Sequence, residues 1–141
     1  MTSRTALDLW RAQITNSSVH RITLGCPKID AALGGGIISS GITEIVGEAG
    51  SGKTQFALVL SLRVQLSTEQ GECVYLSCGE GPFPIKRLQQ IAEEIAKMEN
   101  KNTEVMFSKV HIEQVYNIDD IQTIVVSGRC TIYISLIKYI M

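Results

Sequence analysis

Short β-rich runs alternate with longer helical patterns along most of the chain. Four runs rich in branched and apolar residues predict strands, at residues 42–46, 73–77, 110–115 and 131–137. Patterns typical of helices precede or separate these runs, at residues 5–13, 26–33, 53–66, 84–98 and 117–125. Alternation in this order predicts an α/β fold, with an open, mostly parallel sheet flanked by helices.

A glycine-rich motif connects the first of these predicted strands to the helix predicted after it. The motif fits G-x-x-x-x-G-K-[ST] at every fixed position and consists of Gly47, Glu48, Ala49, Gly50, Ser51, Gly52, Lys53 and Thr54. Its glycines let the backbone wrap closely around an anion, and the helix that follows adds the positive end of its dipole. The motif predicts a phosphate-binding loop for ATP, in which Lys53 reaches the β- and γ-phosphates and the Thr54 hydroxyl ligates Mg²⁺.

Glu80 is the candidate general base for ATP hydrolysis. It follows the strand predicted at 73–77, and in an open parallel sheet that position lies at the same edge as the phosphate-binding loop. A solvated glutamate in a turn fits the same spacing. The Asp that usually supports Mg²⁺ at the end of an apolar strand has no candidate, because Asp119 and Asp120 lie at a predicted helix start and Lys138 follows the last apolar run.

Composition limits the classes of partner. The chain has 141 residues, of which 45% are hydrophobic and 19% charged, and this balance is typical of one globular domain. Its net charge of −1 gives no general attraction to nucleic acid or to an acidic membrane. The apolar stretches are too short to span a membrane, so no membrane partner is expected. The cysteines lack CxxC spacing, which argues against a zinc site and favours the reduced thiols of the cytosol or nucleus.

Three ordered motifs resemble the RecA-like strand-exchange recombinases and their eukaryotic DNA-repair paralogues. They read TLGCPKIDAALGGGI at 23–37, GITEIVG at 41–47 and GKTQ at 52–55. The resemblance implies a partial RecA-like P-loop NTPase core over residues 22–126, after an N-terminal helical or linker segment at 1–21 and before a divergent apolar tail at 127–141. The C-terminal half of the family's core has no counterpart in the matched region, which predicts a truncated or alternatively spliced product.

The same resemblance implies a function in homologous recombination and double-strand break repair. It implies ATP and Mg²⁺ as cofactors, Glu80 as the hydrolytic glutamate, and another recombinase paralogue as the partner in a heterodimer. DNA binding and location in the nucleus, with the cytoplasm as a second compartment, are implied by the resemblance alone. The missing Asp predicts weak hydrolysis.

Two other classes stay open. One is a non-catalytic interaction fragment that competes for a recombinase partner. The other is a small P-loop phosphotransferase, which usually needs an Arg-rich lid over the phosphates. The later half of the chain offers only Arg87 and Arg129 for such a lid, and Lys86 and Arg87 are expected on a solvated helix face.

Overall fold

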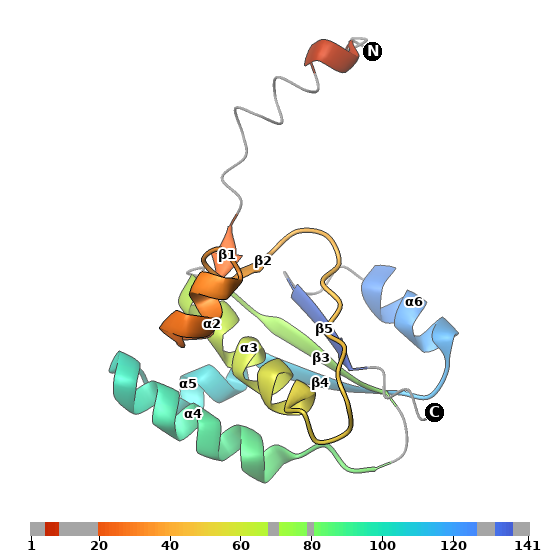
Figure 1. The fold of residues 1–141 in the computed structure, drawn as a ribbon. Helices are drawn as coiled ribbons and strands as arrows, with labels where there is room; N and C mark the ends of the chain where they lie inside the picture. Colours follow the sequence, from red (N-terminus) through yellow and green to blue (C-terminus); the bar gives the residue numbers. More distant parts are fainter. Residues whose placement is uncertain (1–4, 9–19, 68–70, 79–80, 127–131, 137–141) are drawn as a thin grey trace.

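A three-stranded parallel sheet forms the centre of the computed structural model, which describes residues 5–8, 20–67, 71–78, 81–126 and 132–136 (Figure 1). The central strand β3 (Cys73–Cys78) pairs with β4 (Val110–Val115) on one side and with β5 (Ile132–Leu136) on the other. The strands predicted at 73–77, 110–115 and 131–137 are therefore confirmed, and so is the predicted parallel sheet.

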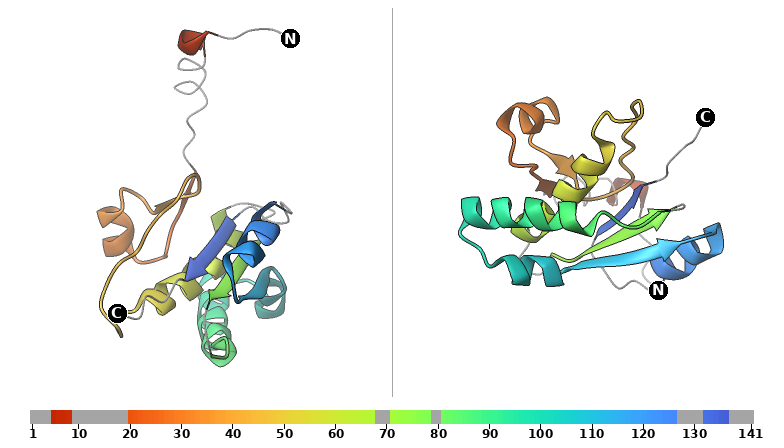
Figure 2. Two further views of the ribbon diagram at one scale, coloured as in Figure 1. Left: turned by 90° about the vertical axis from the view of Figure 1, so that its right-hand side faces the viewer. Right: turned by 90° about the horizontal axis from the view of Figure 1, so that it is seen from below.

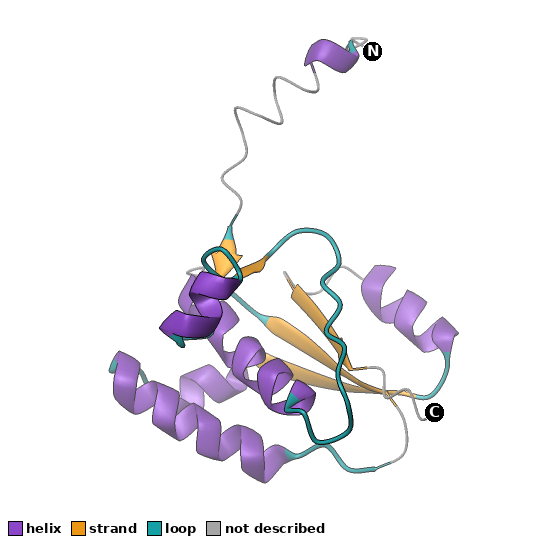
Figure 3. Ribbon diagram, in the orientation of Figure 1, coloured by secondary structure: helices purple, strands orange, loops and turns teal. Residues whose placement is uncertain are grey.

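Helices cover both faces of the sheet (Figures 1 and 3). On one face, α3 (Lys53–Ser67), α4 (Ile85–Glu99) and α5 (Thr103–Ser108) share a buried cluster with Cys73 and Tyr75. On the other, α6 (Ile118–Val126) packs on the cluster that contains Val74 and Leu76. The alternation follows from the strand period of two, which sends successive side chains to opposite faces.

The helix α3 is buried on several sides. Leu58 and Leu62 are fully buried along it, and even Ser61 and Arg63 are largely shielded from water. The helix contacts β3, β5, α4 and β1, so apolar residues are needed nearly all round. This arrangement confirms the helix predicted at 53–66.

A small unit precedes the sheet. Its two short strands, β1 (Arg21–Ile22) and β2 (Ile37–Ile38), pair antiparallel, and α2 (Pro27–Ala32) lies between them. Proline in the first turn and glycines after the last turn bound α2, as the sequence predicts. Gly36 has φ 119°, and a Cβ there would collide with the carbonyl oxygen of Ile22, so glycine is required where the two strands meet.

The prediction of a strand at residues 42–46 is wrong. These residues form an exposed loop between β2 and α3, in which Ile42 is 100% and Val46 83% exposed (Figure 3). A strand needs a hydrogen-bonded neighbour, and this segment pairs with neither edge strand of the described sheet, β4 or β5. The β propensity of this segment therefore has no pairing to stabilise it.

The remaining predicted helices agree with the structure where it can be compared. The patterns at 84–98 and 117–125 correspond to α4 and α6. Residues 6–8 are helical, and the rest of the helix predicted at 5–13 lies outside the described residues. Within the described chain, no helix is both long and apolar enough to cross a membrane.

Candidate phosphate-binding site

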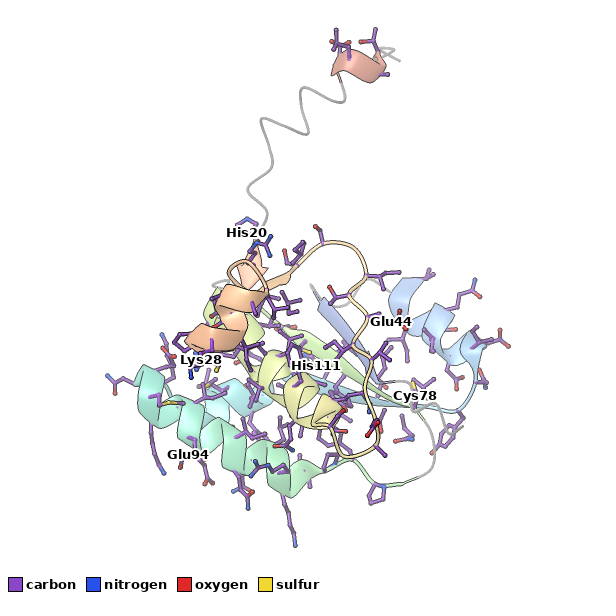
Figure 4. All side chains as sticks on the ribbon, viewed as in Figure 1. His20, Lys28, Glu44, Cys78, Glu94 and His111 are labelled. Atoms are coloured by element: carbon purple, nitrogen blue, oxygen red, sulfur yellow. The ribbon has the colours of Figure 1, made fainter. Side chains whose placement is uncertain are left out.

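The glycine-rich motif, residues 47–54, leads directly into α3, and we call it the phosphate loop. Lys53 is the first residue of α3, and Thr54 follows in its first turn. The helix runs back along the sheet, so its N-terminus lies towards the edge where β3 ends at Cys78 (Figures 1 and 4). The first backbone N–H groups of a helix have no intrahelical acceptor and attract anions. The local fold therefore presents donors and a positive dipole at this edge.

Glycines give the loop its shape. Gly50 has φ 79° and Gly52 has φ 96°, both in the region that other residues rarely adopt. No atom lies within 4 Å of the position of a Cβ added at either residue, so the space beside them is open. At Gly47, in contrast, an added Cβ would lie 2.7 Å from Ser51 Oγ. The side chain of Ser51 therefore occupies the space beside Gly47, while the space beside Gly50 and Gly52 is open.

The ammonium group of Lys53 lies across the loop. Its Nζ donates to the carbonyl oxygens of Gly47, at 2.6 Å, and Glu48, at 2.7 Å, and lies 3.5 Å from Ser51 Oγ. Residues 47–52 are exposed, while Lys53 and Thr54 are half-buried. The cation is thus held inside an accessible loop by carbonyl oxygens, for which the oxygens of a phosphate group would compete.

Arg87, considered above only for the lid of a phosphotransferase, is a second cation near the phosphate loop. Its Nε donates to Oε1 of Gln55 at 2.8 Å, and its Nη1 donates to Oε1 of Gln90 at 3.0 Å. Gln55 follows Thr54 in the first turn of α3, so the guanidinium group lies beside the start of that helix. Lys86 and Arg87 are exposed, so the expected solvated helix face is confirmed, but the contact of Arg87 with Gln55 was not predicted. The available signal was topological: α3 begins and β3 ends at one edge, and α4 begins shortly after β3.

Of the predicted catalytic and metal-binding residues, the structure describes Thr54 but not Glu80. Glu80 lies outside the described residues, so its role as general base stays a prediction. The hydroxyl of Thr54 belongs to the first turn of α3, where the motif requires a Mg²⁺ ligand. Among the described residues, no group of three His, Cys, Asp or Glu side chains could hold a metal ion. Of the two strands beside β3, β5 contains no carboxylate, and β4 contains Glu113 within the strand but no carboxylate at its end.

An α/β sheet covered by a helix that begins with this motif defines the class of P-loop proteins. A sequence model of one family of this class, described as Rad51, matches residues 15–135. Since the match covers most of the chain, the chain belongs to the Rad51 family. The RecA-like fold and the family resemblance predicted from the sequence are confirmed.

Individual relatives match the chain over part of their length. The DNA repair protein XRCC3 of Bos taurus is 47% identical over 92 residues, which cover 62% of this chain and 27% of that protein. XRCC3 of Mus musculus is 37% identical over 110 residues, covering 74% and 31%. The DNA repair and recombination protein RadA of Aeropyrum pernix is 41% identical over 96 residues, covering 65% and 29%. The match therefore spans less than a third of each of these relatives.

Proposed function

We propose that the chain binds Mg-ATP through the phosphate loop and acts in DNA repair by homologous recombination. The observation that carries the proposal is the complete motif at the N-terminus of α3, with the Lys53 ammonium group already inside the loop. Backbone N–H groups of the loop would hold the phosphates, Lys53 would contact the β- and γ-phosphates, and Thr54 would ligate Mg²⁺. The open space beside Gly50 and Gly52 is compatible with a triphosphate.

Hydrolysis of ATP by this chain is expected to be weak. Bound Mg²⁺ supplies charge neutralisation to the phosphates, and a carboxylate usually supports it from a neighbouring strand. Of the two neighbours of β3, β5 (Ile132–Leu136) includes no Asp or Glu, and the one carboxylate of β4, Glu113, lies within the strand and not at its end. Glu80 would still orient a water molecule as general base. Binding without appreciable turnover is therefore the expected behaviour.

The assignment to DNA repair rests on membership of the Rad51 family and on the functions for which its relatives are named. XRCC3 and RadA are both described as DNA repair proteins. By this likeness the chain would act in the nucleus, with another recombinase paralogue as its partner. A net charge of −1 provides no general attraction to DNA, so contact with DNA would depend on that partner.

A non-catalytic interaction fragment is the second candidate function. Two observations favour it: residues 42–46 lack a strand partner in the described sheet, and β5 carries no carboxylate. In this role the chain would bind nucleotide at most and would compete with a longer relative for the recombinase partner.

The rate of ATP turnover separates the two candidates. We would measure phosphate release by the purified chain, with and without single-stranded DNA, and would use Glu80→Gln as the control. The expected result is ATP binding with turnover no faster than that of the control. Turnover stimulated by DNA and abolished in Glu80→Gln would assign an active ATPase instead, and absence of ATP binding would refute the proposed function.

A further inference from the structure

The small unit of β1, α2 and β2, residues 20–38, is here named the N-terminal unit. We propose that the N-terminal unit opens from α3 in a single step while the sheet stays intact, and that the buried cation of Arg63 makes this opening easy. The inference adds a conformational equilibrium to the molecule and does not depend on the proposed nucleotide site.

The contact between the N-terminal unit and the rest of the fold is small. Ile22, Leu24 and Ile37 belong to the buried cluster that includes α3, whereas no residue of α2 is buried. The hydrogen bonds that pair β1 with β2, and those at the end of α2, lie inside the unit. Figure 2 shows the unit, in orange, at one side of the molecule and outside the layer of the sheet. Three apolar side chains therefore form most of its attachment.

Arg63 lies at this attachment and is incompletely paired. It belongs to α3, its side chain is only 8% exposed, and it is the one charged residue that is buried in the described part of the chain. Its guanidinium group packs against Gly25, just before α2. Its Nη1 donates to Oε1 of Glu99 at 2.5 Å, but its buried Nε has no hydrogen-bond partner among the described residues. A buried N–H without an acceptor destabilises the closed form.

Opening would return the guanidinium group to water. Once the N-terminal unit leaves α3, Gly25 no longer covers Arg63, and water can accept from Nε. The detached unit would not stay folded, because strands of two residues and a helix of six are too short to be stable alone. Its internal hydrogen bonds are then lost, while β3, which pairs on both sides, keeps its own. Amides inside the unit therefore report the opening.

The two partners of the ion pair should have opposite effects on this equilibrium. Arg63→Met keeps a long side chain at the attachment and removes the buried charge, and Glu99, at 38% exposure, stays hydrated without its partner. This change should favour the closed form. Glu99→Gln removes the countercharge and leaves the guanidinium group buried, so it should favour the open form. Both changes would weaken an ion pair that only stabilised the fold.

Hydrogen exchange of the whole chain, resolved by residue, tests the inference. The amides of Leu33 and Gly35 donate to the carbonyl oxygens of Ile29 and Asp30, inside the N-terminal unit. We expect these two amides to be at least about tenfold less protected from exchange than the amides of β3. They should also share one opening free energy, because the unit opens in a single step.

Three variants then test the part played by Arg63. Arg63→Met should slow exchange of the two reporter amides about tenfold, and Glu99→Gln should speed it about tenfold. Glu94→Gln is the matched control, because Glu94 pairs with Lys97 in an exposed position of the same helix. This control should leave the exchange rates of the reporter amides unchanged.

Three results would overturn the inference. If the reporter amides are as well protected as those of β3, the N-terminal unit opens only when the whole fold unfolds. If Arg63→Met and Glu99→Gln both speed exchange, the ion pair simply stabilises the fold. If the variants change exchange in β3 but not at the reporter amides, Arg63 stays buried during the opening. None of these results bears on ATP binding, so failure here is separate from failure of the proposed function.

Discussion

The ionisation of Tyr75 depends strongly on the fold. Its side chain is only 3% exposed, and its ring packs edge-on against Phe83, with 4.9 Å between centroids. Burial raises the pKa of the Tyr75 phenol to about 12, and the nearby Cys78 and Cys73 act in the same direction. The folded protein therefore binds the phenolic proton more tightly than the unfolded chain does.

Stability should fall at alkaline pH because of this phenol. The contribution is fully present below about pH 10, the pKa of an unfolded tyrosine, and is lost as the pH rises towards 12. In that range, one proton can change the free energy of unfolding by at most about 1.4 kcal/mol per pH unit. Tyr75→Phe should flatten this slope in urea unfolding measured from pH 9 to 12.

Tyr116→Phe is the matched control, because Tyr116 is 83% exposed. The difference between the slopes of the two variants therefore reports the buried phenol of Tyr75. An equal slope in the two variants would contradict the raised pKa of Tyr75.

At the scale of elements, Arg63 joins the small N-terminal unit to two helices. It lies on α3 with 7% of its surface exposed, and its Nη1 donates to Oε1 of Glu99 on α4 at 2.5 Å. The guanidinium group also lies against Gly25, so closely that a Cβ on Gly25 would collide with it. The backbone N–H of Gly25 in turn donates to the carboxylate of Asp30 on α2, at 3.1 Å. One side chain thus fixes how α2, α3 and α4 meet.

Gly25→Ala should lower the free energy of unfolding by more than its backbone strain alone. Gly25 has φ 76°, and an L-residue in that region costs about 1–2 kcal/mol. The collision with Arg63 adds to that cost. Gly41→Ala is the control, because Gly41 has φ 82° but nothing within 4 Å of its added Cβ.

Chemical denaturation of both alanine variants and of the double variant Gly25→Ala/Arg63→Ala checks this prediction. The double variant should lose less than the sum of its two single changes, since removing the guanidinium relieves the collision. Strict additivity would show that Gly25 and Arg63 do not interact.

Elements with strong local signals could be predicted from the sequence, and elements that depend on distant partners could not. The start of α6 is an example of a local signal: Asn117 Oδ1 accepts from the backbone N–H of Asp120 at 2.9 Å, which is the hydrogen bond of a helix cap. The short α5 was missed, although Asn102 caps it in the same way by accepting from the backbone N–H of Val105. The pairing of β1 with β2 was missed because each strand has two residues.

Residues 42–46 are the opposite case. Its residues carry a clear strand pattern, yet pairing is a property of the sheet and not of the segment. Local propensity predicted a strand at 42–46, but these residues form a loop, because the pattern does not indicate which strand would pair with them.

At the scale of the whole molecule, the glycine-rich loop at 47–52 and the helix after it could be predicted from the sequence, but their surroundings could not. A short motif is enough to predict this part of the structure, because the loop and the helix are adjacent in the chain. The contact between Arg87 and Gln55, at 2.8 Å, joins residues of two different helices and depends on how α4 packs against α3. Such contacts follow from the layering of the molecule, which short motifs do not encode.

The central claim is that residues 47–54 hold the phosphates of ATP, and titration with a fluorescent ATP analogue in the presence of Mg²⁺ tests it most directly. The loss of one charge-assisted hydrogen bond, about 1.5–3 kcal/mol, should weaken binding to Lys53→Ala roughly 10- to 100-fold. Lys97→Ala is the control, because Lys97 is an exposed residue of α4 that pairs with Glu94 at 2.8 Å. The account predicts that this control binds like the unaltered chain. Equal affinity of Lys53→Ala and the unaltered chain would contradict it.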